Sequence, residues 1–202
     1  MNLSILIATY GEDSWEQMAL TRALPSVRDF SCEILVGHDP EGTCASSRNG
    51  LAERATGEWL CFLDADDELA PGFLDAMARA LEQDVGGSCV LLTPAVQQVH
   101  GRSRRPPFFF PESSFETGNW IIIGTLVQSD LFLGVGGFEE FPHGLEDWQL
   151  WAKCVRAGAR IVKVPDAVYI AHYNRQSKHH RLQRSRREYL KAYEAARASV
   201  WA

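Results

Sequence analysis

The stretch Trp59-Leu60-Cys61-Phe62-Leu63-Asp64-Ala65-Asp66-Asp67 decides the fold of this chain. An apolar run of strand length ends in three carboxylates within four positions. A buried strand delivers such residues to its C-terminal end, where α/β proteins place their ligands. Clustered carboxylates raise each other's pKa unless a cation lies among them, and Mg²⁺ or Mn²⁺ suits oxygen ligands of this kind. The alternative is an acidic cap before the helix expected to start near Pro71.

Segments of strand and helix character alternate around this stretch. Apolar runs at 3–8, 33–37 and 58–63 predict buried strands. The order strand, helix, strand, helix, strand with short joints predicts an α/β fold, a mainly parallel sheet flanked by helices. The expected helices cover residues 15–30, with a break at Pro25, then 45–55 and 72–83.

The second half of the chain is less regular. Strands are expected at 89–99, 120–127 and 160–164, and a helix at 146–157. Residues 100–118 form a long connection, and connections of this length are usually functional or mobile. An apolar stripe at helical spacing between Leu182 and Val200 predicts that residues 178–202 form an amphipathic tail packed on the domain 1–177. A contact of that stripe with a membrane surface or with a second copy of the chain, in a homodimer, is the alternative.

Composition sets further bounds. With 202 residues the chain fits a single domain, and no apolar run approaches the roughly 20 residues of a membrane span, so no integral membrane segment is expected. The first residues lack the basic start of a signal peptide, which favours a cytoplasmic protein. Five cysteines without paired spacing argue against a disulfide framework or a structural zinc site. A net charge of -6 argues against a general nucleic-acid binder.

Two further sets of charged residues can take part in catalysis or binding, judged from their residue types and positions alone. Asp147 and Glu146 begin the helix expected at 146–157, where either acid can cap the helix and compensate its dipole, or a partly desolvated carboxylate can act as a general base. Arg48 is either an exposed helix arginine or a bidentate ligand for a diphosphate.

Several segments now fall into one known order, and the chain resembles the GT-A-fold, Rossmann-like inverting glycosyltransferases of the family 2 type. The likeness extends from Leu3 to about Ser177. Its carriers are Ser4-Ile5-Leu6-Ile7-Ala8-Thr9-Tyr10, Glu33-Ile34-Leu35-Val36 with Asp39, Ser47-Arg48-Asn49-Gly50, Gly57-Glu58-Trp59 through Asp67, Gly136-Gly137-Phe138-Glu139-Glu140 and Gly144-Leu145-Glu146-Asp147-Trp148.

The resemblance implies a nucleotide-sugar site near the first strands. Thr9 and Tyr10 match the end of the strand that lines the nucleotide pocket, and Arg48 matches a residue near the diphosphate. Asp39 matches the acidic residue that binds the base, commonly uracil. The chain departs from the family pattern here, because His38 stands in place of the first of two aspartates.

The resemblance also implies roles for the acidic residues in binding the ribose, binding a metal ion and accepting a proton. Asp64 matches the position that holds the ribose, and Asp66 matches the position that holds a Mn²⁺ or Mg²⁺ ion. His172 matches a position where some relatives place another metal ligand; a hydrogen-bonded core histidine is the alternative. Asp147 matches the general base.

Glu146 and Trp148 flank this base and are expected on the acceptor side. A tryptophan supplies flat apolar surface for a sugar, although core packing explains it equally well.

The function implied is metal-dependent, inverting transfer of a sugar from a nucleotide-diphosphate sugar, expected to be UDP-linked, to an acceptor hydroxyl. The acceptor is left open among a glycan, a lipid-linked sugar, a protein side chain and a modified base. Two alternatives remain: a non-catalytic nucleotide-sugar-binding protein and a sugar nucleotidyltransferase. The second would use a glycine-rich, lysine-bearing phosphate loop, which is not found after the first strand.

Overall fold

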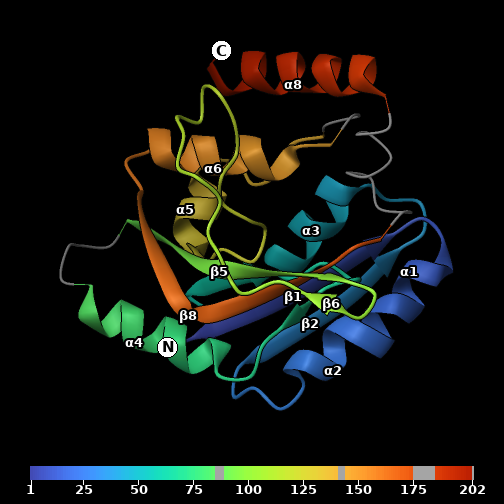
Figure 1. The fold of residues 1–202 in the computed structure, drawn as a ribbon, viewed down its shortest axis with the longest axis vertical. Helices are drawn as coiled ribbons and strands as arrows, with labels where there is room; N and C mark the ends of the chain where they lie inside the picture. Colours follow the sequence, from blue (N-terminus) through green and yellow to red (C-terminus); the bar gives the residue numbers. More distant parts are fainter. Residues whose placement is uncertain (85–88, 141–143, 175–184, 202) are drawn as a thin grey trace.

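The computed structural model describes residues 1–84, 89–140, 144–174 and 185–201. Two four-stranded sheets form the centre of this part of the chain, with the strand orders β2-β1-β3-β7 in the first sheet and β4-β8-β5-β6 in the second. Figure 1 shows helices on both sides of these strands, so the expected α/β architecture is confirmed.

The first sheet is built from the predicted apolar strands. β1 (Leu3–Tyr10) pairs in parallel with both β2 (Glu33–Asp39) and β3 (Trp59–Phe62), while β7 (Val127–Gln128) pairs antiparallel with β3. Ile5 and Cys61 face each other in this register and are completely buried. Continuous apolar runs of this kind are typical of strands covered on both faces.

The helix expected at 15–30 is interrupted ahead of Pro25. It consists of α1 (Asp13–Met18), a π-helical turn η1 (Ala19–Ala23) and α2 (Leu24–Val27). Proline has no N–H with which to donate to the preceding turn, and a wider turn accommodates that missing bond.

The next two helices follow the prediction more closely. α3 (Cys44–Ala52) begins at a capping box made by Thr43 and Ser46, and α4 (Phe73–Gln83) buries one face that includes Phe73 and Met77. α3 contacts β1 and β2, and its residues Cys44 and Arg48 line the same pocket as Thr9 and Tyr10 at the carboxyl end of β1.

The second sheet contains the longest strands. β5 (Val90–His100) pairs in parallel with β8 (Arg160–His172), and the short strands β4 (Glu68–Leu69) and β6 (Ser103–Arg104) pair antiparallel with β8 and β5. The strand expected at 160–164 thus continues to His172. The register shifts between Pro94 and Ala95, so residues 165–167 have no partner, and this irregularity accommodates Pro165 within a strand.

The prediction of a strand at 120–127 is wrong. Most of this run is irregular, and only its end forms β7 and an isolated bridge between Leu126 and Leu92. Ile121 and Ile123 are nevertheless buried, which explains their apolar character without any strand pairing. Gly124 lies so close to the ring of Tyr169 that a Cβ at this position would be 2.2 Å from a ring carbon.

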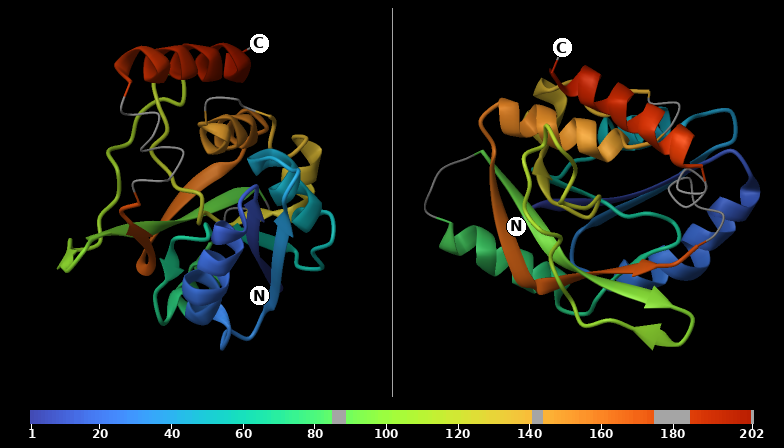
Figure 2. Two further views of the ribbon diagram at one scale, coloured as in Figure 1. Left: turned by 90° about the vertical axis from the view of Figure 1, so that its right-hand side faces the viewer. Right: turned by 45° about the horizontal axis from the view of Figure 1, so that its top comes forward.

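In the described residues the fold is completed by the helices α5 (Ser129–Gly134), α6 (Glu146–Arg156) and α8 (Arg186–Trp201). α8 packs on α6, with Ala192 and Ala196 completely buried and the rings of Tyr193 and Trp148 5.0 Å apart. Figure 2 shows α8 lying over α6, with the connection after β6 rising toward it. Residues 178–184 of the expected tail lie outside the described residues.

Among the described helices, none combines the length and the apolar character needed to cross a bilayer.

We expect Gly124→Ala to destabilise the protein, because Tyr169 is 2 % exposed and its ring must move to admit the methyl group. Overpacking of this kind costs about 1–3 kcal/mol, which urea unfolding can measure. Gly50→Ala is the matched control, because Gly50 lies inside α3 and nothing lies within 4 Å of the added carbon. That variant should be neutral or stabilised by up to about 1 kcal/mol. Equal unfolding midpoints for the two variants would contradict the close contact.

Candidate active site

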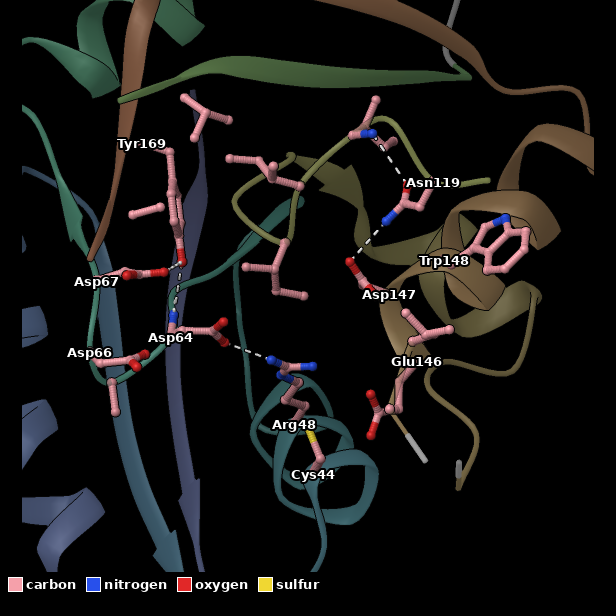
Figure 3. A pocket seen from close by; sticks show the side chains of 18 of the residues that line it. Cys44, Arg48, Asp64, Asp66, Asp67, Asn119, Glu146, Asp147, Trp148 and Tyr169 are labelled. Atoms are coloured by element: carbon pink, nitrogen blue, oxygen red, sulfur yellow. Dashed lines mark hydrogen bonds and ion pairs between the residues drawn. The ribbon is translucent and has the colours of Figure 1, made fainter. Parts of the chain in front are cut away.

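A pocket of about 620 Å³ opens between the first sheet, the second sheet and α6. Its size falls in the range typical of small-molecule sites, which is about 300–1,000 Å³. Figure 3 shows the acidic residues after β3 on one side of the pocket, the start of α6 on the opposite side, and Arg48 between them. The fold therefore brings the two acidic groups predicted from the sequence, the aspartates after β3 and the acidic start of α6, to one cavity.

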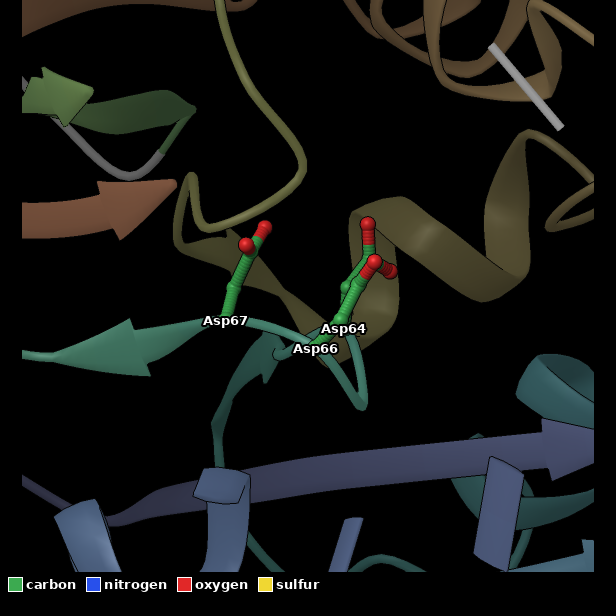
Figure 4. A group of neighbouring side chains, drawn as sticks. All are labelled: Asp64, Asp66 and Asp67. Atoms are coloured by element: carbon green, nitrogen blue, oxygen red, sulfur yellow. The ribbon is translucent and has the colours of Figure 1, made fainter. Parts of the chain in front are cut away.

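The three aspartates that follow β3 lie on a single tight turn. The backbone N–H of Asp67 donates to the carbonyl of Asp64 at 3.1 Å, which closes the turn. One ligand atom from each of Asp64, Asp66 and Asp67 can be chosen such that all lie within 4.8 Å of one another (Figure 4). We call Asp64–Asp67 the acidic turn. Three carboxylate oxygens at this spacing could hold a divalent cation.

Residues of β8 support the buried end of the acidic turn. The hydroxyl of Tyr169 donates to Asp67 Oδ2 at 2.8 Å, and the backbone N–H of His172 donates to Asp67 Oδ1 at 2.8 Å. The Asp64 N–H in turn points at the Tyr169 hydroxyl at 3.4 Å. Asp67 is therefore a buried carboxylate with both oxygens hydrogen-bonded.

The imidazole of His172 is directed elsewhere. Its Nε2 lies 3.0 Å from Glu68 Oε1, and burial lowers its pKa, so that the neutral ring is favoured. His172 thus contacts the acidic turn through its backbone, while its ring pairs with the residue that follows the turn.

Burial and repulsion act on the carboxylates of the acidic turn together. Burial raises the pKa of Asp66, and the negative charge of Asp64 raises it further, although Asn174 Nδ2 donates to Asp66 Oδ2 at 2.9 Å. The pKa of Asp67 lies well above its usual range for the same reasons, burial first and then the charges of Asp66 and Asp64. A bound cation would relieve this repulsion.

Arg48 is held beside the acidic turn by α3. Its Nη2 lies 2.6 Å from Asp64 Oδ1, and its guanidinium lies 5.1 Å from the centroid of the Phe138 ring. The side chain is 13 % exposed, which rules out the alternative of a freely solvated helix arginine. It supplies positive charge and a planar donor face to the pocket.

The predicted nucleotide residues divide into two groups. Thr9 and Tyr10 line the pocket, and burial raises the pKa of Tyr10 to about 12, so its hydroxyl stays protonated. Asp39 is exposed and is not among the described residues that line the pocket; its carboxylate accepts the N–H of Glu41 at 3.2 Å. His38 Nδ1 lies 2.9 Å from the Thr9 hydroxyl, directly behind the pocket wall.

The first turn of α6 carries the second acidic group. Leu145 precedes it with φ 76° and ψ 22°, a left-handed conformation that is uncommon for a residue with a side chain. Asp147 then faces the pocket, and Asn119 Nδ2 donates to its Oδ2 at 2.9 Å. Glu146 is buried next to it and points toward Arg48 (Figure 3).

The environment of Asp147 suits proton transfer near neutral pH. Burial and the charge of Glu146 raise its pKa to about 6, against the opposing effect of Arg48. A carboxylate with this pKa is mostly ionised at neutral pH and is more basic than an ordinary aspartate.

Trp148 proves to be mainly a packing residue. It is 1 % exposed, and its indole N–H donates to the carbonyl of Phe115 at 2.7 Å. Trp148 still contributes to the lining of the pocket, while most of its indole packs in the interior, where its ring lies 5.0 Å from that of Tyr193 on α8.

Sequence reasoning missed several residues of the pocket, and three of them hold other parts of the site in place. Tyr169 looks like a strand residue, Asn119 lies in the irregular connection, and Tyr193 belongs to the tail stripe. No local pattern marks them, because each acquires its role from a partner far away in the sequence.

Known proteins similar to this chain belong to the family that its sequence motifs resemble. The sequence model of "Glycosyl transferase family 2" matches residues 27–130, just over half of the chain. Pre-mycofactocin glycosyltransferase of Mycobacterium tuberculosis, from two strains, is 29% identical over 160 residues, which is 71% of this chain. The chain spans about a third of the length of these relatives, since the match covers 33% of each.

Solved structures share the fold at low sequence identity. S. aureus TarS in complex with UDP superposes with a TM-score of 0.70 at 18% identity, over 99% of this chain and 65% of that one. TarS in complex with UDP-GlcNAc gives a TM-score of 0.68 at 18% identity over 88% of this chain and 60% of that one. GalNAc-T7 with UDP, GalNAc and Mn²⁺ gives 0.60 at 13% identity, over 96% of this chain and 48% of that one.

The resemblance seen in the sequence and the arrangement of strands and acidic residues thus lead to one conclusion: this chain belongs to glycosyl transferase family 2 and has the GT-A fold.

Proposed function

We propose that this protein is a metal-dependent, inverting glycosyltransferase that moves a sugar from a nucleotide-diphosphate sugar to an acceptor hydroxyl. One observation carries the proposal: a single pocket holds the acidic turn at one end and Asp147 at the other. The first group suits the departing diphosphate and the second suits the incoming hydroxyl. A protein that only bound the donor would not need a second, more basic carboxylate facing the same cavity.

The donor end of the pocket is formed by the strand ends and α3. Thr9 and Tyr10 line the place expected for the nucleoside, and Asp64 offers acceptors to the ribose hydroxyls. Arg48 can exchange part of its contact with Asp64 for bidentate hydrogen bonds to the diphosphate. A UDP-linked sugar is the expected donor, since UDP and UDP-GlcNAc are the ligands of the similar TarS structures.

The residues that follow β3 fit a divalent cation. Asp66 offers a carboxylate oxygen to it, with Asp64 and Asp67 close enough to share it. Burial, and then the charges of the neighbouring carboxylates, raise the pKa of both Asp66 and Asp67, and a bound cation would offset both effects. His172 can join them only if its ring leaves Glu68, so we place it at the edge of this site. When bound, Mn²⁺ or Mg²⁺ supplies electrostatic neutralisation of the diphosphate as it departs.

Asp147 is the proposed general base. It accepts the proton of the acceptor hydroxyl as that oxygen attacks the sugar carbon, and its raised pKa makes it a stronger base than an ordinary aspartate. Attack from the side of α6, with the diphosphate held on the opposite side at the acidic turn, inverts the configuration at that carbon. Glu146 lies beside the base, on the acceptor side of the pocket.

Replacement of the base is the first test. Asp147→Asn keeps the shape of the side chain and its bond with Asn119 but cannot accept a proton, so the rate of transfer should fall by at least about 100-fold. Thermal-shift titration with UDP and Mn²⁺ should show that nucleotide binding is retained, because the donor end is unchanged. Transfer at the wild-type rate would refute the assignment of the base.

The pH profile tests the environment of the same residue. Because the base must be ionised, kcat/KM of the wild-type enzyme should rise with pH through a midpoint near the pKa of Asp147, about 6. Glu146→Gln removes a neighbouring negative charge that raises this pKa, so the rise should move to lower pH. A midpoint that does not respond to Glu146→Gln would contradict the assigned coupling.

The cation site makes a prediction about stability. The raised pKa of Asp66 means that the native state holds its ionised form poorly, so the stability of the metal-free protein should decrease as pH rises above the ordinary carboxyl value of about 4 and through the raised native value. Asp66→Asn should flatten this decline and, at neutral pH without metal, should stabilise the protein by about 1 kcal/mol.

The Asp66→Asn variant should also lose its binding of the cation. Mn²⁺ should raise the melting temperature of the wild-type protein and not that of Asp66→Asn. A variant that is stabilised by Mn²⁺ as strongly as the wild type would place the cation elsewhere.

A further inference from the structure

The acceptor side of the pocket is closed by an irregular segment, residues 113–121, which we call the acceptor wall. It lies beside the packed pair α6 and α8 and is hydrogen-bonded to both. The indole N–H of Trp148 on α6 donates to the carbonyl of Phe115 at 2.7 Å, and the hydroxyl of Tyr193 on α8 donates to the carbonyl of Thr117 at 2.7 Å. These bonds fix the wall at two positions just before Asn119 in the chain.

Asn119 is held within the wall in a defined orientation. Its side-chain carbonyl Oδ1 accepts the backbone N–H of Ile121 at 3.2 Å, and its Nδ2 donates to Asp147 Oδ2 at 2.9 Å. An ionised carboxylate can accept hydrogen bonds but cannot donate them, and a backbone N–H can donate but cannot accept. Both partners therefore require the same orientation of the amide, with its NH₂ group toward Asp147.

This hydrogen bond has two physical consequences for Asp147. A donor to a carboxylate stabilises the ionised form, and so opposes burial and the charge of Glu146, which both raise the pKa. The bond also restricts rotation of the carboxyl group, because the amide itself is anchored to the backbone of the wall. A base must lie within hydrogen-bond reach of the hydroxyl it deprotonates, and small displacements reduce rates strongly.

We propose that Asn119 is a positioning residue that holds Asp147 ionised and correctly oriented to deprotonate the acceptor. This inference rests on the proposed role of Asp147 as the base. It also ties the base to the acceptor wall, so that a substrate bound against the wall acts on the orientation of the catalytic carboxylate.

The other groups around Asp147 act on it in different ways. Glu146 on its own helix and Asp64 on the acidic turn carry negative charge and raise its pKa, whereas Arg48 on α3 lowers it from a distance. The backbone N–H of Trp148 also donates to the carboxyl group and lowers its pKa, but this donor belongs to α6 itself. From α8, Tyr193 faces Trp148 and the wall. Among the described side chains, Asn119 is the one that donates to Asp147, and it ties the carboxyl group to a different segment.

Asn119→Asp is the sharpest test, because the new side chain has the same shape and can still accept the Ile121 N–H. It replaces the donor with a like charge, so the acidic limb of the pH profile should move to higher pH and kcat should fall by about ten- to a hundredfold. Asn119→Ala removes the donor without adding charge and should give a smaller shift in the same direction. KM for the nucleotide sugar should stay unchanged in both variants, since the donor end is untouched.

Glu116→Gln serves as the control, because Glu116 is an exposed residue of the same wall. It changes the charge of the wall without touching Asp147 and should leave the pH profile in place. An acidic limb that stays fixed in both Asn119 variants, or that moves equally in Glu116→Gln, would overturn the proposal. A loss of thermal stability with an unmoved pH profile would mean that Asn119 only packs the wall.

A second measurement separates this inference from the proposed function. The pKa of Asp147 can be followed by carbon NMR of its carboxyl group in the free protein, with Asp147→Asn used to assign the signal. The pKa should increase in the order wild type, Asn119→Ala, Asn119→Asp. If no nucleotide sugar is turned over, the proposed function fails, yet this titration still decides whether Asn119 controls the ionisation of Asp147. The same pKa in all three proteins would refute the hydrogen bond in solution.

Discussion

Mutual repulsion among the carboxylates of the acidic turn is the constraint on which the site depends. The turn follows a strand that is buried on both faces, so water cannot screen these charges fully. Each carboxylate is instead met by a donor from another part of the chain: Asp64 by Arg48 of α3, Asp66 by Asn174, and Asp67 by Tyr169 and the backbone of His172. The second sheet thus stabilises the end of the first. Gly124 belongs to the same arrangement, because only a residue without a side chain leaves room for the Tyr169 ring.

The two acidic groups of the pocket differ in how their charge can be balanced. At the acidic turn, several carboxylates converge and a cation can balance them. At α6, burial and the charges of Glu146 and Asp64 raise the pKa of a single residue, Asp147, to about 6. Environments that separate the pKa values of nearby carboxyl groups are a common way for an enzyme to assign them different tasks. Arg48 lies between the two groups and interacts with both, so its charge links the donor end of the pocket to the base.

The sequence predicts the parts of this protein that depend on local order. The buried strands β1, β2 and β3 and the acidic turn are contiguous segments with clear patterns, and Asp147 stands in a recognisable context at a helix start. The failed strand at 120–127 shows the limit of such patterns, because a buried apolar run does not require a paired backbone. For His172, the resemblance predicts a metal ligand, and that role stays a prediction, because in this structure the ring pairs with Glu68 beside the acidic turn. The missed residues depend on distant partners: Asn119 and Asp147 are 28 positions apart, Tyr193 and Thr117 are 76 apart, and Tyr169 and Asp67 are 102 apart.

The two ends of the pocket also differ in how they are built. The donor end consists of strand ends and a capped helix, whose positions are set by the sheets. The acceptor end consists of an irregular wall fastened to α6 and α8 by single hydrogen bonds to carbonyl groups. Irregular segments on a rigid scaffold tolerate change more readily than the elements they connect. Substitutions in the wall can therefore alter what binds beside Asp147 without disturbing the acidic turn, whereas the orientation of Asp147 itself depends on the wall through Asn119. The acceptor wall therefore affects both which acceptor binds and how the Asp147 carboxylate is oriented.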